Sequence, residues 1–196
     1  MNQALGRPFE DALVYASRLH TSQRRKGTSI PYISHLMAVA SLVLEAGGDE
    51  EEVIAALLHD GPEDQGGLKT LTEIREHFGD RVGNIVAGCS DTFEAQKPAW
   101  KVRKQAYLDH LRDADRSTRL ISCADKLHNA RAILADYREL GDALWNRFNA
   151  GREDVLWYYG ELARIFSELG PSSLARQLSR VVDDLNEEAM AGSNER

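Results

Sequence analysis

Residues 53–60 read Val-Ile-Ala-Ala-Leu-Leu-His-Asp, and this stretch decides the fold of the chain. Six apolar residues in succession put hydrophobic side chains on every face of a helix, which predicts a helix buried on all sides. Asp49 precedes the stretch as an N-cap, and residues 50–52 are glutamates, whose charge suits the start of a helix. The buried helix ends in His59 and Asp60, and an aspartate in such surroundings needs a partner.

Helical patterning extends over almost the whole chain, because apolar residues recur at spacings of three and four while strand-like alternation is scarce. Pro8 suits the first turn of a helix, Gly47 and Gly48 end another, and residues 70–73 read as a capping box. We expect an all-α fold, a single-domain bundle of roughly eight to ten helices over residues 1–196, with a core at about 8–190 and a disordered tail at 191–196. The predicted helices cover about 8–20, 33–46, 50–58, 70–78, 80–90, 100–112, 117–136, 139–147, 152–169 and 171–189.

The composition is that of a globular protein, with 42% hydrophobic and 28% charged residues among 196 and a net charge of −7. This charge argues against binding to nucleic acid, which requires a broad basic surface, but it allows a local basic pocket for a small anion. No apolar run reaches the ~18 residues of a membrane span, and residues 1–20 lack a signal-peptide pattern, so we expect a cytoplasmic protein without a membrane partner. A homo-oligomer is compatible with the sequence but not indicated by it.

Two histidines and two aspartates from three predicted helices form a candidate metal site. Besides His59 and Asp60, His35 lies near the start of the preceding helix, and Asp125 lies in the apolar segment LISCADKLHN at 120–129. Taken alone, the His59-Asp60 pair reads as a capping aspartate beside a core histidine, but a buried Asp125 has to be paired or bound to a metal. The donor set suits manganese, iron or zinc, and it leaves open positions where water can become a nucleophile.

Further polar residues lie close to these four in the sequence. Glu63 and Asp64 follow four residues after the His-Asp pair and are candidate acid–base groups, with solvated loop charge as the simpler interpretation. Asn129 lies one turn beyond Asp125 on the same helix face, so it can bind a substrate or orient the aspartate. His128 is interpreted as a packed side chain.

Basic and aromatic residues are placed to bind an anionic substrate that carries a base. Residues 24–26, Arg-Arg-Lys, lie in the predicted loop before His35 and can bind phosphate. Trp157 or Tyr158, in an aromatic region otherwise expected in the core, is the candidate for stacking on a base. A second basic cluster, explained equally well as a solvated helix face, comprises Lys97, Lys101, Arg103 and Lys104.

These residues, in this order, resemble the hydrolase domain of the RelA/SpoT alarmone enzymes, and more closely the stand-alone small alarmone hydrolases, which are HD-type proteins. The likeness spans roughly residues 9 to 165 and as a set its motifs are specific, whereas a lone His-Asp pair is not. The segments that carry it are QRRK at 23–26 leading to PYISH at 31–35, LLHD at 57–60, Glu63-Asp64, and SCADKLHN at 122–129.

The resemblance implies a metal-dependent phosphohydrolase with an HD-type helical fold. Such an enzyme removes the 3′-pyrophosphate from guanosine tetra- and pentaphosphate, (p)ppGpp, giving GDP or GTP and pyrophosphate, and it typically uses Mn²⁺. The matched residues are His35, His59, Asp60 and Asp125 for the metal, Glu63 and Asp64 for the attacking water, and Arg25, Lys26, Asn129 and Trp157 for the substrate. Two alternatives stay open: an HD phosphohydrolase of another nucleotide, such as a nucleoside monophosphate or NADPH, and a non-catalytic nucleotide-sensing module.

Overall fold

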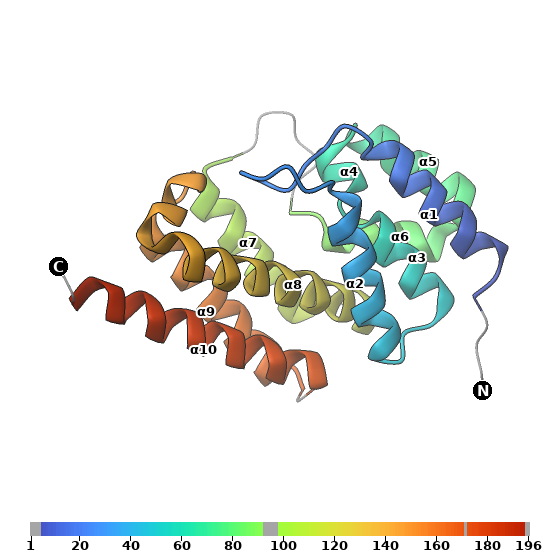
Figure 1. Cartoon of the computed structure of the whole chain (residues 1–196). Helices are drawn as coiled ribbons and strands as arrows, with labels where there is room; N and C mark the ends of the chain where they lie inside the picture. Colours follow the sequence, from blue (N-terminus) through green and yellow to red (C-terminus); the bar gives the residue numbers. More distant parts are fainter. Residues whose placement is uncertain (1–4, 92–97, 171, 195–196) are drawn as a thin grey trace.

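The computed structural model describes residues 5–91, 98–170 and 172–194, and over these residues the chain is helical, as predicted (Figure 1). The β-type pairing in this part of the chain is limited to an isolated bridge between Arg24 and Pro31. None of the described helices is both long enough and apolar enough to cross a membrane. The helices are α1 (Arg7–Leu19), α2 (Ile33–Glu45), α3 (Glu50–Leu58), α4 (Gly61–Asp64), α5 (Leu68–Phe78), α6 (Asp80–Cys89), α7 (Trp100–Asp113), α8 (Arg116–Leu140), the 3-10 helix η1 (Gly141–Arg147), α9 (Arg152–Glu168) and α10 (Ser173–Asn194).

Helix α8 is the centre of the bundle. It packs against α2, α3 and α6 from the N-terminal half of the chain and against α9 and α10 from the C-terminal half (Figure 1). Its fully buried side chains include Ile121, Ala124, Leu127 and Ala130, which recur at every third position. Because Asp125 lies within this buried stretch, its carboxylate faces neighbouring helices rather than bulk water.

The quoted stretch forms the buried helix that its apolar run predicts. Residues 53–58 of α3 are all at most 2% exposed. The expected N-cap is present, since Asp49 Oδ1 accepts from the backbone N–H of Glu52 at 2.9 Å and Glu52 Oε2 accepts from the N–H of Asp49 at 2.9 Å. Ser117 at the start of α8 donates to the buried Glu52 carboxylate at 2.7 Å. This contact joins the first turn of α3 to the first turn of α8.

The segment between α1 and α2 is an ordered turn that folds back on itself. Arg25 N–H donates to the carbonyl of Ile30 at 2.9 Å, and Tyr32 N–H donates to the carbonyl of Gln23 at 3.1 Å. Gly27 lies near the tip with a φ of +72°, a conformation that glycine adopts without steric cost. The turn therefore holds its basic residues next to the start of α2, where His35 lies.

Three boundaries differ from those predicted. Helix α5 begins at Leu68 rather than at a capping box, and Thr70 inside it donates its hydroxyl to the carbonyl of Gln65. Helix α8 continues to Leu140 and passes directly into the 3-10 helix η1, whose first residue, Gly141, has a φ of +55°. Helix α10 continues to Asn194, so residues 191–194 of the expected disordered tail are helical, and residues 195–196 lie outside the described part of the chain.

Candidate metal centre and active site

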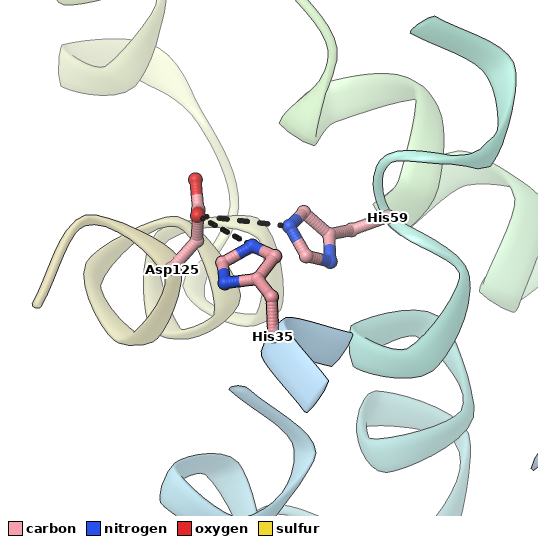
Figure 2. A group of neighbouring side chains, drawn as sticks. All are labelled: His35, His59 and Asp125. Atoms are coloured by element: carbon pink, nitrogen blue, oxygen red, sulfur yellow. Dashed lines mark ion pairs between the residues drawn. The ribbon is translucent and has the colours of Figure 1, made fainter. Parts of the chain in front are cut away.

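Four helices bring the predicted metal ligands together. His35 lies in the first turn of α2, His59 directly follows α3, Asp60 precedes α4, and Asp125 lies in the middle of α8. The Nε2 atom of His35 is 3.3 Å from Asp60 Oδ2 and 3.2 Å from Asp125 Oδ1, and the Nε2 atom of His59 is 3.1 Å and 3.8 Å from the same two oxygens. Figure 2 shows the side chains of His35, His59 and Asp125 pointing toward one another from separate helices.

The chemistry of these donor atoms fits a divalent cation. One donor atom each from His35, His59 and Asp125 lies within 4.8 Å of the others, and all three residues are buried. An ion bound at about 2.1 Å keeps its ligand atoms roughly 3–4 Å apart, so little movement is needed. The Nε2 atoms of both histidines are buried and have no hydrogen-bond partner among the described residues. Burying a polar nitrogen without a partner is energetically unfavourable, so these two atoms are expected to bind a ligand.

Hydrogen bonds at the other ring nitrogens hold both imidazoles in place. His59 Nδ1 donates to the carbonyl of Ala56 at 2.8 Å, which leaves Nε2 as the ring nitrogen that can bind a cation. His35 Nδ1 lies 2.8 Å from His128 Nδ1. Burial, together with the charges of His35 and Arg25, lowers the pKa of His128 to about 4, so this ring is neutral near pH 7 and can accept from His35. His128 is therefore more than the packed side chain expected from the sequence.

Each carboxylate is oriented by its own donors. Tyr32 donates its hydroxyl to Asp60 Oδ2 at 2.6 Å. Lys126 donates to Asp125 Oδ2 at 2.6 Å, and Asn129 donates its amide N–H to Asp125 Oδ1 at 2.5 Å. Asp60 Oδ2 and Asp125 Oδ1, the oxygens that accept from Tyr32 and Asn129, are also the oxygens nearest the imidazoles, so these donors fix the atoms that face the centre.

The two aspartates of the centre carry negative charge, which positively charged neighbours stabilise. Burial raises the pKa of Asp60, but His59 and His35 outweigh burial and hold that pKa well below its usual value. Burial likewise raises the pKa of Asp125, and Lys126, His35 and His59 outweigh it. Burial lowers the pKa of His59, while Asp60 and Asp125 raise it well above its usual value. A proton on His59 thus supplies the charge that a bound cation would otherwise supply, and cation binding would displace it.

A basic, partly aromatic cavity of about 300 Å³ lies beside the metal centre. Arg25 donates to Asn129 Oδ1 at 2.8 Å, which connects this cavity to the carboxylate of Asp125 through Asn129. The ammonium group of Lys26 lies 5.7 Å from the centre of the Phe148 ring. The lining residues include Arg25, Lys26, Tyr32, Asn129, Phe148 and Tyr159.

The predicted acidic pair lies on α4, beside the centre. Gln23 donates its amide to Asp64 Oδ2 at 2.7 Å, which ties the basic turn to this carboxylate. Glu63 Oε2 accepts weakly, at 3.5 Å, from the backbone N–H of Asp91. The side chain of Asp91 accepts from Arg103 at 2.6 Å and, in a second ion pair, from a lysine of the same helix.

The structure does not bring Trp157 into the cavity. Its ring packs edge-on against Trp100 at 6.5 Å and lies under the ammonium group of Lys101 at 5.1 Å. Lys104 donates to Asp91 at 2.8 Å and lies over the Tyr158 ring. Lys97 of the second basic cluster lies outside the described residues. The aromatic rings that line the cavity are instead Tyr32, Phe148 and Tyr159.

Tyr32, Gln23, Lys126 and His128 were not assigned roles from the sequence, although each contacts a predicted site residue. The signal for Lys126 and His128 was their position beside Asp125, but helical spacing does not predict a bond from His128 to a residue of another helix. The signal for Tyr32 and Gln23 was their place in the segments around the basic turn. Their partners, Asp60 and Asp64, are brought near only by the packing of α4.

Comparison with models of known protein families identifies the family of this chain. The model of the HD domain matches residues 12–156. The chain belongs to the HD domain family. HD hydrolases bind a divalent metal, and in this HD protein His35, His59 and Asp125 form a group that can hold one.

The relatives of this HD protein include enzymes of alarmone metabolism. It is 36% identical over 126 residues to a Xenopus tropicalis protein named guanosine-3′,5′-bis(diphosphate) 3′-pyrophosphohydrolase MESH1, covering 63% of this chain and 68% of the relative. An Aquifex aeolicus protein named as a pyrophosphohydrolase of the same compound is 34% identical over 125 residues, covering 64% of this chain. The chain spans only 18% of that relative and 15% of a probable GTP pyrophosphokinase from Mycobacterium leprae.

Two solved structures share the HD fold. A metazoan ortholog of SpoT, described as hydrolysing ppGpp, superposes with a TM-score of 0.73 over 90% of this chain and 94% of its own, at 24% identity. A protein from Listeria monocytogenes superposes with a TM-score of 0.67 over 80% of this chain and 98% of its own, at 30% identity. These likenesses confirm the all-α, HD-type fold predicted from the sequence.

Proposed function

We propose that this protein hydrolyses the 3′-pyrophosphate of guanosine tetra- and pentaphosphate, releasing pyrophosphate and GDP or GTP. The observation that carries the proposal is the meeting of two buried, unpaired imidazole nitrogens with two carboxylates beside a basic cavity. The Xenopus relative, which is named for this reaction, supports the choice of substrate. The acidic net charge of −7 agrees with a small nucleotide rather than nucleic acid as partner, and a soluble nucleotide is consistent with a cytoplasmic location.

His35, His59, Asp60 and Asp125 are the proposed ligands of one divalent ion, and Mn²⁺ is the proposed metal. Nitrogen and carboxylate donors suit this ion. When bound, the cation would supply Lewis acidity to the phosphoryl group under attack. Tyr32 and Asn129 would hold the two carboxylates in position by donating to the oxygens named above.

Arg25, Lys26 and Asn129 are the proposed substrate-binding residues. Arg25 and Lys26 would bind phosphate oxygens, because both line the cavity beside the metal centre. Phe148 and Tyr159 line the same cavity and are better placed than Trp157 to lie against a base. We therefore transfer the stacking role from Trp157 to these two rings.

Glu63 and Asp64 are the proposed acid–base groups. A water molecule attacks the phosphorus atom that carries the ribose 3′ oxygen, and the bond between that oxygen and phosphorus breaks. One carboxylate accepts the proton of the water, the departing 3′ oxygen gains a proton, and pyrophosphate leaves with the new oxygen. Gln23 would position Asp64 through the 2.7 Å hydrogen bond between them.

The decisive experiment is incubation of the purified protein with Mn²⁺ and guanosine tetraphosphate, followed by ion-exchange chromatography. We expect GDP and pyrophosphate in equal amounts. Asp64→Asn should reduce turnover while metal content stays near that of the unaltered protein, and Asp183→Asn, at an exposed position on α10, is the matched control. Turnover of a nucleoside monophosphate or NADPH in place of guanosine tetraphosphate would establish the first alternative. Tight nucleotide binding without any turnover would establish a sensing module.

A further inference from the structure

Asp136 lines the same cavity as the proposed substrate-binding residues, although neither the motifs nor the metal centre includes it. It lies on α8, seven residues after Asn129 and eleven after Asp125. Positions separated by four, seven and eleven residues share one face of a helix. At 1.5 Å of rise per residue, Asp136 lies about 16 Å along α8 from the metal ligand Asp125. The cavity thus has a metal end and a distant carboxylate end.

An ion pair fixes the position of this carboxylate. Arg147 of η1 donates to Asp136 Oδ2 at 2.7 Å. The side chain of Arg147 lies directly against Gly27 of the basic turn, because a Cβ atom at Gly27 would be only 2.8 Å from Arg147 Cδ. The side chains of Asp136 and Arg147 are 36% and 26% exposed, so the ion pair is partly buried and both groups remain accessible to a ligand. The other oxygen of Asp136, Oδ1, has no hydrogen bond to another described residue.

A fixed carboxylate beside a guanidinium group matches one nucleobase edge better than any other. Guanine presents two adjacent donors, N1–H and the 2-amino group, and next to them the acceptor O6. Hypoxanthine lacks the 2-amino donor, and adenine presents an acceptor at N1. Phe148 and Tyr159 line the same cavity and offer aromatic faces to a base.

We propose that Asp136 is a specificity-determining residue that accepts hydrogen bonds from N1–H and the 2-amino group of a guanine base, with Arg147 facing O6. This inference rests on the proposed function, since it assigns the base end of the same site. A nucleoside that is bound with its 3′ phosphate at the metal end would point its base along α8 toward Asp136. The 3′ phosphates, which Asp136 would repel, would lie at the metal end beside Arg25, which donates to Asn129 Oδ1.

Equilibrium binding of the 5′-diphosphates of guanosine, inosine and adenosine tests this inference without requiring turnover. Hydrogen bonds to a charged group contribute strongly, so we expect guanosine diphosphate to bind about tenfold to a hundredfold more tightly than inosine diphosphate. Asp136→Leu should bring this ratio close to one, and Asp136→Asn should reduce it less, because the amide keeps one acceptor. Glu139→Gln, an equal change of charge at an exposed position of the same helix, should keep the ratio of the unaltered protein.

Thermal melting shows whether each variant is folded. Comparison of its affinities for the three nucleotides then separates base recognition from a purely structural ion pair. If Asp136 only ties α8 to η1, then Asp136→Leu will weaken binding of all three nucleotides by the same factor, and the proposal is overturned. Equal affinities of the unaltered protein for guanosine and inosine diphosphates would overturn it too. The protein could fail to hydrolyse guanosine tetraphosphate and still prefer guanosine diphosphate, with that preference lost in Asp136→Leu. This result would refute the proposed reaction and support the assignment of Asp136.

Discussion

Replacing His128 with phenylalanine tests how the metal centre is held. His35 can bind a cation through Nε2 only if its proton is on Nδ1, and in the structure that proton is directed at His128 Nδ1, 2.8 Å away. Without a cation, His35 can move its proton to Nε2 and donate to Asp60 or Asp125 instead. His128→Phe removes the acceptor, so only the metal-bound state keeps a buried N–H without a partner.

The expected loss of Mn²⁺ affinity follows from this unpaired N–H of His35, which is present only in the metal-bound state. A buried donor that loses its partner costs about 1–3 kcal/mol, and His35 is fully buried. Since about 1.4 kcal/mol corresponds to a factor of ten, Mn²⁺ affinity should fall about tenfold to a hundredfold. His128→Asn should recover most of this loss, because its amide oxygen can occupy nearly the place of Nδ1.

Electron paramagnetic resonance of free Mn²⁺, titrated against each variant, measures the affinity directly and requires no substrate. His77→Phe, at an exposed histidine on α5, is the control for loss of a histidine away from the centre. Unchanged Mn²⁺ affinity in His128→Phe would show that His128 does not select the protonation state of His35. An equal loss in His128→Asn and His128→Phe would point to packing instead of hydrogen bonding.

Three further outcomes are expected. Asp125→Asn should abolish both bound Mn²⁺, measured by elemental analysis, and hydrolysis, because it removes a charged ligand from a buried centre. Asp115→Ala should lower the free energy of unfolding by about 1 kcal/mol at pH 7 in urea melts, because Asp115 caps α8 through Thr118. Burial raises the pKa of Asp115 but the Thr118 hydrogen bonds outweigh it and lower that pKa, so the contribution is complete above the unfolded value of 3.8 and is lost as the pH falls below it. Gly27→Ala should lower the free energy of unfolding by about 1–2 kcal/mol and raise the KM for nucleotide, because the residue has a φ of +72° and its added Cβ meets Arg147. Urea melts measure the first effect and steady-state kinetics the second.

The helical fold could be predicted because its signals are local. The apolar run of α3 and the capping residues Asp49 and Glu52 lie within a few positions of one another, and their effects do not depend on the rest of the chain. The start of α5 was predicted wrongly because the Thr70 hydroxyl, expected to cap the helix, has another partner. Thr70 looked like a cap, yet its hydroxyl bonds to the turn that precedes α5, and the helix begins two residues earlier.

The candidate ligands could be named for a different reason. Charged and imidazole side chains inside apolar helices carry a desolvation cost, so His35, His59 and Asp125 stood out wherever the chain was otherwise apolar. Their convergence on one metal was proposed because the histidines and aspartates lay on apolar predicted helices, and the packing of α2, α3 and α8 brings His35, His59 and Asp125 together. Trp157 had equally good aromatic character, but its position on α9 directs it to Trp100 and away from the cavity.

The amino-acid sequence by itself determined that the chain is helical, which side chains are expensive to bury, and that an acidic protein carries a local basic turn. Only the tertiary structure decided that His128 supports His35, that Tyr32 holds Asp60, and that Asp136, paired with Arg147, lines the cavity. The physical reason is the distance along the chain over which each interaction acts. Helix formation and desolvation act on a residue and its near neighbours, whereas a directional hydrogen bond requires two atoms within about 3 Å, and only packing brings atoms from distant segments that close.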